Sequence, residues 1–541
     1  MRATTRSLPW PRSSVHVMIA SAMEQLRSRD PFRTVHVAAL ALCAIMLPWS
    51  TAFLSIAQML LVVNWLAEGV VRKDLLQRLR AGLGSAAALV FISFFLLHVV
   101  GLLWTTDMEW GLDLVRILLP IISFTPVLAS APRLSKDELS TVLLLGAWSV
   151  VVSTLVSLFM RPDAGSDYRS LSVFISHIRL TLLLCLAVVV LLKERPALSW
   201  LRWAGVLAAL WSIFFINKLG SIQGFVILAG LAWVFLRRLQ FLGRKGLRIV
   251  VRSILIVVPI ILLLFGIHEA RKRYQLPDPA LANSLERTSS GDHYEHDLTN
   301  PQTENGTHVW TFFAWREMYT GWAARSDRPM DSLDDKGNPL RSTLARYLSS
   351  KGERKDSLAI MALSDVEVRA IETGVTNVMQ GKRSKLRERF EEVFFEMEIY
   401  YAYGAADGHS VAMRLEFLRA GWALAKSNWI YGVGTGDTKI AFEQQYENMH
   451  TALSKEYRYR AHNEYLTLLI SFGVIGLLWS LFAWWWPAWQ QGAWRTSYFI
   501  AWAIIFGISC LSDDTIETQA GATFLGLYYA LFVFGAPRQE A

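Results

Sequence analysis

The sequence predicts an all-α polytopic membrane protein with about twelve membrane-spanning helices and one large helical domain inserted between the ninth and tenth spans. Three observations lead to this fold class. The 541 residues are 53% hydrophobic, their mean hydropathy is +0.31, and long apolar runs alternate with short basic segments. This composition is too apolar for an ordinary soluble protein.

Twelve segments are long and apolar enough to cross roughly 30 Å of hydrocarbon. We place them near residues 34–48, 51–69, 83–104, 111–130, 138–160, 171–193, 199–216, 222–237, 249–268, 463–486, 496–511 and 517–536. The first two form a predicted hairpin around Pro48. Residues 1–33 are a basic arm, and because a long basic stretch precedes the first apolar run, we expect no cleavable signal peptide.

Lysine and arginine predict the orientation, because they gather on the cytoplasmic side of membrane proteins. With both termini inside, the predicted inner segments carry 23 Lys and Arg residues and the short outer loops carry 3. The net charge of +9 therefore reflects topology and gives no support for nucleic-acid binding. We expect residues 34–268 to hold spans one to nine, and residues 462–541 to hold spans ten to twelve with a short cytoplasmic tail.

The long outer segment, residues 269–461, is predicted to be a periplasmic helical domain. Its 193 residues carry 26 Lys and Arg against 28 Asp and Glu, and all three cysteines of the chain lie in predicted spans instead. The domain is therefore expected to fold without disulfides. Apolar spacing predicts helices near residues 308–325, 341–350, 356–379, 384–402, 409–428 and 437–449.

Two arginines fall within predicted spans, where a charge is costly without a partner. Arg179, in Phe174-Ile-Ser-His-Ile-Arg, is expected two helical turns below the outer end of span six, with no acid nearby in its own helix. This favours a functional role. Arg116 lies about one turn inside span four, and a structural ion pair with Asp107 or Asp113 is an equal alternative.

The outer segment carries a further arginine and a glycine-rich block. Arg414 lies on a predicted helix, where a solvated surface position is the simpler interpretation from spacing alone. Gly432-Val-Gly-Thr-Gly follows. Because no strand precedes these glycines and no Lys-Ser/Thr follows them, a tight turn towards the bilayer explains them better than a nucleotide site.

His462-Asn-Glu464 marks the point where the polar segment meets span ten. A histidine at this boundary is commonly interfacial, but the neighbouring polar residues favour a catalytic role. Asp513, Asp514 and Glu517 lie between spans eleven and twelve and could pair with the arginines or orient His462. A metal site is the alternative, which the lack of Asp-x-Asp pairs and of zinc-ligand spacing argues against.

Together these motifs resemble the bacterial O-antigen ligases and the related O-antigen polymerases and oligosaccharyltransferases. The resemblance rests on His462-Asn-Glu-Tyr-Leu with Gly473-Val-Ile-Gly-Leu-Leu, on Arg414 with the Gly432 block, and on the stretch ending in Arg179. It covers roughly residues 85–265 and 405–535 and implies a fold of the GT-C glycosyltransferase type. Where the family often has a Ser-Arg pair, this chain has Lys218-Leu-Gly-Ser, so a phosphate contact there would need Lys218.

The resemblance implies a periplasmic enzyme of the inner membrane of a Gram-negative bacterium. It would move O-antigen from undecaprenyl pyrophosphate to a sugar hydroxyl of the lipid A core, without a cofactor or metal and with inversion. His462 would be the base, with Glu464 as the alternative base. The residues that would bind substrate are Arg179, Arg414, Arg116, Lys218, Glu464 and Asp514.

Other functions remain open at this point. A polymerase would pass the same donor to a second lipid-linked glycan, and a protein O-oligosaccharyltransferase would pass it to a serine or threonine. A transporter of polysaccharide or lipid is a more distant alternative, because it predicts internal repeats and broken helices that the sequence does not display.

Overall fold

The computed structural model describes residues 30–161, 168–194, 199–237, 276–380, 393–397, 399–400 and 404–538, with isolated positions at 249, 250, 253, 264 and 268. The predicted ninth span (249–268) and most of the basic arm (1–33) therefore lie outside the described residues. By its contacts the chain divides into two compact units, one of residues 1–231, 421–442 and 460–541 and one of residues 232–420 and 443–459.

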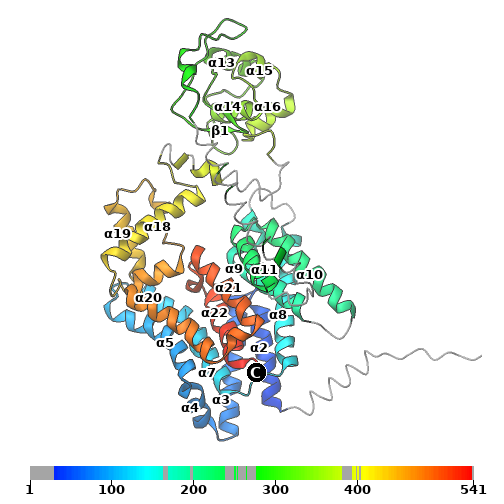
Figure 1. Cartoon of the computed structure of the whole chain (residues 1–541), viewed down its shortest axis with the longest axis vertical. Coiled ribbons are helices and arrows are strands. Elements are labelled where there is room, and N and C mark those ends of the chain that lie inside the picture. The colour runs from blue at the N-terminus through cyan, green and yellow to red at the C-terminus, as the bar shows by residue number, and fades with distance from the viewer. Residues whose placement is uncertain are drawn as a thin grey trace, which may run out of the picture. The chain divides into compact units, whose positions relative to one another are not determined.

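The first unit begins with a helical hairpin, as the sequence predicts. Helices α2 (Pro31–Met46) and α3 (Thr51–Val71) pack against each other, and α2 also packs against α8 (Lys136–Met160) (Figure 1). Asp30 caps α2 by accepting a hydrogen bond from the amide of Phe32 at 3.2 Å. Arg33 then pairs with Glu138 of α8 at 2.7 Å, which fixes the start of both helices.

The next helical elements contain the residues of predicted spans three and four. They are α4 (Leu75–Gly84), α5 (Ala86–Val100), η1 (Gly101–Trp104), α6 (Met108–Ile117) and α7 (Leu119–Ser130). The single span predicted at 111–130 is thus two helices, which meet at Leu118 before Pro120. Helix α4 approaches α7 closely, because a Cβ on Gly82 would lie 2.8 Å from the carbonyl oxygen of Pro126.

The rest of the first unit brings distant parts of the chain together. Helix α9 packs against α8, α10 and α21, while α20 packs against α5 and α22 against α7 (Figure 1). The bounds are η2 (Tyr168–Leu171), α9 (His177–Lys193), α10 (Ser199–Lys218), α11 (Ile222–Arg237), α20 (Glu464–Gln490), η5 (Ala493–Arg495), α21 (Ser497–Ser512), η6 (Thr515–Glu517), α22 (Gln519–Ala530) and the π-helix η7 (Leu531–Gly535).

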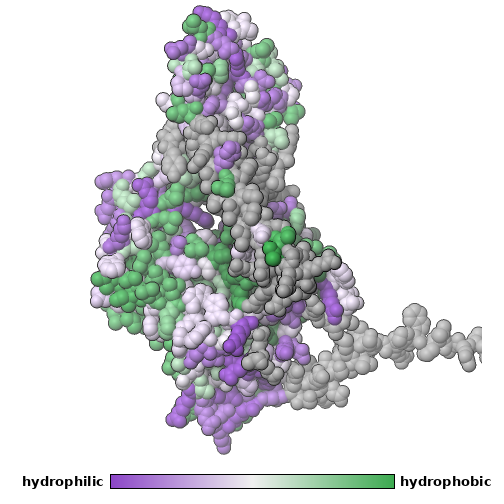
Figure 2. Space-filling model, viewed as in Figure 1, coloured by the Kyte–Doolittle hydropathy of each residue, from purple (hydrophilic) through white to green (hydrophobic). Residues whose placement is uncertain are grey.

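Six helices in the described part of the chain are long and apolar enough to cross a membrane, so the predicted number of twelve is not confirmed. Shorter apolar helices occur at Pro31–Met46, Ile222–Phe235, Ser497–Ser512 and Gln519–Gly535. Figure 2 shows apolar side chains over α20 and α5, where Ile475, Leu478 and Trp479 are exposed. Together with the helical fold, this exposed apolar surface fits a multi-pass membrane protein.

The second unit has its own buried core, as expected for a domain. The core gathers Val309, Phe313, Trp322, Leu344 and Ile360 with ten further buried side chains. Its elements are η3 (Pro279–Asn283), β1 (Thr303–Glu304), β2 (Thr307–His308), α13 (Trp315–Ala323), α14 (Leu340–Ser350), α15 (Ser357–Met361), α16 (Asp365–Glu372) and η4 (Lys455–Tyr457). Helices α18 (Ser410–Ser427) and α19 (Thr438–Asn448) each run across the division between the units.

The structure corrects two expectations for this unit. The helix predicted near 308–325 starts at Trp315, because β1 and β2 form an antiparallel hairpin around Asn305-Gly306, both with positive φ. The helix predicted at 356–379 is two short helices, because Ser364 and Glu367 form a capping box that starts α16. The unit is therefore mainly, but not wholly, helical.

Candidate functional site

Helix α20 is broken at Gly473, and the glycine-rich block docks into the break. Gly473 has a φ of +64°, so the helical hydrogen bonds are interrupted there. The amides of Val433 and Gly434 donate to the carbonyls of Ile470 and Ser471, each at 2.9 Å, and the amide of Val474 donates to Trp429. The block therefore satisfies the backbone groups that the break exposes, which a membrane helix requires. The glycine-rich block thus supports the broken helix in addition to forming the turn that the sequence predicts.

Asp437, which the sequence analysis did not single out, anchors the end of this block. Its carboxylate accepts hydrogen bonds from the amides of Thr106 and Asp107, both at 2.8 Å. Thr435 donates to the carbonyl of His98 at 2.7 Å. The loop between η1 and α6 is thus held against the docked block.

His462 lies immediately before the cap of α20. Its φ of +48° is uncommon for a residue other than glycine. Asn463 is the N-cap: its side chain accepts a hydrogen bond from the amide of Leu466 at 3.0 Å and donates one to the carbonyl of Leu511 at 3.1 Å. The cap thus ties α20 to the end of α21 and directs the histidine towards the segment that follows α21.

Two carboxylates face the histidine ring. The Nδ1 atom of His462 is 3.8 Å from an oxygen of Asp513 and 3.9 Å from an oxygen of Asp514. The side chains of both acids are 7% exposed, whereas that of His462 is 37% exposed. Thr467 donates to Asp514 at 2.8 Å and so holds that carboxylate in place. The structure therefore brings His462 and Asp514 together, as the sequence analysis suggested.

Arg179 belongs to the same cluster, but not at the expected depth. Helix α9 starts at His177, after the N-cap Ser176, so Arg179 lies in its first turn rather than two turns below the outer end of the span. Its guanidinium forms an ion pair with Asp513, donates to the carbonyl of Asp514 at 2.9 Å and donates to the hydroxyl of Thr518 at 3.0 Å. The acid that its own helix lacks comes from the end of α21.

Glu464, Glu517 and Arg460 complete the charged cluster. Glu464 is 1% exposed and accepts a hydrogen bond from the amide of Ile516 at 3.0 Å. Glu517 forms an ion pair with Arg460, whose guanidinium lies 5.3 Å from the ring centroid of Trp110. Arg460, two residues before His462, was not a predicted site residue, whereas Asp513 was expected to pair with an arginine or to orient His462.

Two of the other predicted residues, Arg116 and Lys218, occupy exposed positions of the first unit. Arg116 pairs with Asp113 at 2.8 Å on the surface of α6, and its side chain is 70% exposed. The sequence analysis gave a structural ion pair of Arg116 with Asp107 or Asp113 as an alternative, and the structure shows the pair with Asp113 on the same helix. Lys218 is an exposed residue in the last turn of α10, with its amine 5.7 Å from the ring centroid of Phe214. Arg414 belongs to the second unit. In the described part of the chain, no group of three or more His, Cys, Asp or Glu side chains could hold a metal ion.

A family model described as O-antigen ligase matches residues 368–481. This segment of the chain is similar to the O-antigen ligase family domain. The match includes Arg414, the glycine-rich block, His462 and the first part of α20, and it confirms the family that the sequence motifs indicated. Arg179 and Asp513 lie outside the matched residues. No curated protein sequence matches the chain.

Proposed function

We propose that this protein is an O-antigen ligase of the bacterial inner membrane, with its active site facing the periplasm. The donor is O-antigen polysaccharide on undecaprenyl pyrophosphate, and the acceptor is a sugar hydroxyl of the lipid A core. The acceptor oxygen forms a bond to the anomeric carbon of the donor while the bond from that carbon to the pyrophosphate oxygen breaks. The acceptor proton goes to the enzyme, and undecaprenyl pyrophosphate leaves. One displacement of this kind inverts the anomeric centre.

The observation that carries the proposal is the position of His462 against Asp513 and Asp514. A base for a sugar hydroxyl needs a proton acceptor that works near neutral pH, and histidine is the side chain best suited to this. The two carboxylates lie near Nδ1, so Nε2 is the nitrogen that would take the proton. A carboxylate beside the ring favours the charged imidazolium that forms as the proton moves.

We propose that Arg179 supports the reaction by positioning Asp513. The sequence analysis expected Arg179 to bind the pyrophosphate, but each of its three guanidinium nitrogens already makes a bond within the segment Asp513–Thr518. Its side chain is also 8% exposed. The diphosphate therefore needs other cations. Arg414, Lys218 and Arg116 stay the proposed candidates, with arginine favoured for its two parallel donors.

Glu464 is less suited than His462 to act as the base. Its side chain is buried and already accepts a bond from the amide of Ile516, which joins the start of α20 to η6. The side chain of His462 is 37% exposed, and the residue lies just before α20 with a positive φ. We therefore assign proton transfer to His462 and give Glu464 the role of holding the loop that carries Asp513 and Asp514.

The test is an in vitro transfer reaction with purified protein, undecaprenyl-pyrophosphate-linked O-antigen and rough lipopolysaccharide, in EDTA and without nucleotide. Wild type is compared with His462→Ala and with His293→Ala, a matched exposed histidine of the second unit. We expect extended lipopolysaccharide from wild type and His293→Ala, and loss of about two to four orders of magnitude in rate for His462→Ala. The anomeric configuration of the new linkage, measured by NMR, tests inversion.

Four outcomes would contradict parts of this proposal. Elongated lipid-linked glycan in place of modified lipopolysaccharide would mean a polymerase. Glycan on an added acceptor protein alone would mean an oligosaccharyltransferase. Full activity of His462→Ala would remove the histidine from proton transfer, and inhibition by EDTA would overturn the metal-independent mechanism.

A further inference from the structure

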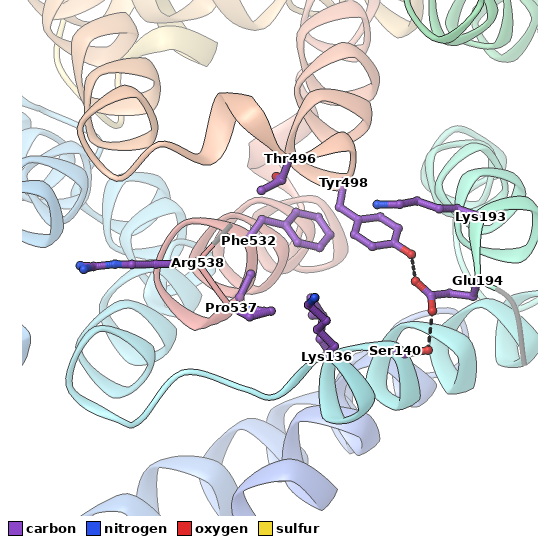
Figure 3. Close-up of a pocket in the computed structure, with 11 residues that line it drawn as sticks. Lys136, Ser140, Lys193, Glu194, Thr496, Tyr498, Phe532, Pro537 and Arg538 are labelled. Atoms are coloured by element: carbon purple, nitrogen blue, oxygen red, sulfur yellow. Dashed lines mark hydrogen bonds between the residues drawn. The ribbon is translucent and has the colours of Figure 1, made fainter. Parts of the chain in front are cut away.

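A second pocket lies at the opposite ends of the helices that carry the candidate site. It has a volume of about 680 Å³ and is lined by the start of α8, the end of α9, the start of α21 and the end of η7 (Figure 3). Arg179 lies in the first turn of α9, whereas Lys193 is the last residue of that helix. Seventeen helical residues at 1.5 Å each separate the two ends by about 25 Å. The pocket is therefore a separate feature from the cluster around His462.

The charged lining of this pocket is mostly basic. Lys136, Lys193 and Arg538 line it together with one carboxylate, that of Glu194. In Figure 3, the amines of the two lysines extend towards the cavity from different helices, whereas the side chain of Arg538 points away from them. Glu194 is already engaged, because it accepts hydrogen bonds from Ser140 at 2.6 Å and from the hydroxyl of Tyr498.

A further arginine lies just beyond the edge of the pocket. Arg133 donates to the carbonyl of Ala536 at 2.8 Å and to the side-chain oxygen of Gln491 at 3.0 Å, both of which are neutral acceptors. Burial and the nearby charge of Arg538 lower the pKa of Arg133. The cations at this end of the helices outnumber the one carboxylate of the lining, so a bound anion would be attracted to them.

The other half of the pocket is apolar. Leu139 and Phe532 are buried side chains of membrane helices, and Pro537 and Ala536 extend this surface towards Arg538. A free phosphate ion would leave this surface without a partner. A molecule that carries both a phosphate and an alkyl chain matches both halves of the pocket.

We infer that this pocket binds the headgroup of an anionic phospholipid, with the phosphate between Lys136 and Lys193 and the upper part of an acyl chain against Leu139 and Phe532. The pocket is formed by segments that the Lys and Arg distribution predicts to be cytoplasmic, where the leaflet is anionic and basic pockets between membrane helices bind lipid headgroups. Lys193 is also positioned by Tyr498, whose ring centroid lies 3.6 Å from its amine.

The test uses the full-length protein in detergent and measures the midpoint of thermal unfolding during titration. The three probes are short-chain phosphatidylglycerol, phosphatidylcholine with the same chains, and inorganic phosphate. We expect phosphatidylglycerol to raise the midpoint at concentrations where the other two have little effect, because only the ligand that binds the folded state stabilises it. Lys136→Gln and Lys193→Gln should each weaken the apparent affinity for phosphatidylglycerol by about fivefold.

Lys73→Gln is the matched control, since Lys73 is an exposed lysine of another predicted cytoplasmic segment, and it should bind like wild type. Lys136→Gln and Lys193→Gln lie on different helices, so either variant tests the site if the other fails to fold. Equal stabilisation by phosphatidylcholine would overturn charge recognition. Equal stabilisation by inorganic phosphate would overturn the lipid as ligand. Wild-type affinity in both lysine variants, or in the one that folds, would overturn the site.

Discussion

Gly432 and Gly473 pack backbone against backbone. A Cβ on Gly473 would lie 2.1 Å from the carbonyl oxygen of Ile430, and a Cβ on Gly432 would lie 2.3 Å from the amide nitrogen of Phe472. Real Cβ atoms do not approach backbone atoms so closely, and both glycines also have positive φ. The glycine-rich block and the break in α20 therefore depend on each other, and the break lies about two and a half turns after Glu464, the first residue of the helix.

Replacing Gly473 with alanine should destabilise the fold. The added methyl group must displace backbone on Ile430, and alanine is strained at this φ, so we expect a loss of at least about 1–3 kcal/mol in the free energy of unfolding. Gly84→Ala is the control, because a Cβ there meets no atom within 4 Å at the end of an exposed helix. Thermal unfolding followed by tryptophan fluorescence measures both. A Gly473→Ala protein as stable as Gly84→Ala would show that the loop can move away at no cost.

Arg179 and Arg116 offer a matched comparison of a buried and an exposed ion pair. Arg179→Ala leaves the buried Asp513 without its partner, and breaking such a pair commonly costs about 3–5 kcal/mol. Arg116→Ala removes a pair whose side chains are 70% and 52% exposed, and it should change the free energy of unfolding by less than about 1 kcal/mol. Transfer activity should fall in Arg179→Ala, and a fall in Arg116→Ala without a loss of stability would support Arg116 as a ligand of the pyrophosphate. Similar unfolding curves for both variants would contradict this account.

The sequence predicted the helical membrane fold and the cluster members that lie near sequence motifs, but not how they meet. Asp513 could be placed only near span eleven, since its pairing with Arg179 joins residues 334 positions apart. The depth of Arg179 was wrong because Ser176 starts the helix six residues later than hydropathy indicated. No periodic pattern in the sequence predicts that Gly432 docks against the break at Gly473 either. Such long-range backbone contacts depend on packing, which local patterns do not encode.

His462 and Glu464 can be told apart by conservative substitution. Glu464→Gln keeps an oxygen that can accept from the amide of Ile516, so we expect its kcat to stay within about tenfold of wild type. His462→Gln removes the imidazole that would take the proton and should lower kcat by about two to four orders of magnitude with little change in KM. The measurement is the rate of lipopolysaccharide modification at saturating donor. The reverse order of the two effects would make Glu464 the base.

The second unit contains a buried lysine that should make its stability depend on pH. Lys355 is 1% exposed and donates to the carbonyls of Thr311 at 3.0 Å and His308 at 3.2 Å. Burial lowers the pKa of its amine to about 7, from 10.5 for an exposed lysine. Between these two values the unfolded chain holds a proton that the folded chain lacks, so stability should rise with pH from about 7 to about 10.5. Below about pH 7 the amine is charged in both the folded and the unfolded chain, so stability no longer changes with pH through this group and the full cost of burying the charge remains.

Hydrogen exchange of α13 and α14, corrected for the intrinsic effect of pH on exchange, measures this dependence in the full chain. Protection should increase from pH 7 to pH 9 in wild type, and Lys355→Met should remove most of the increase, because methionine fills a similar volume without a titrating group. Lys351→Met is the control, since Lys351 pairs with Glu367 at 2.8 Å near the surface and should leave this pH dependence in place. An unchanged slope in Lys355→Met would show that another group is responsible for the pH dependence.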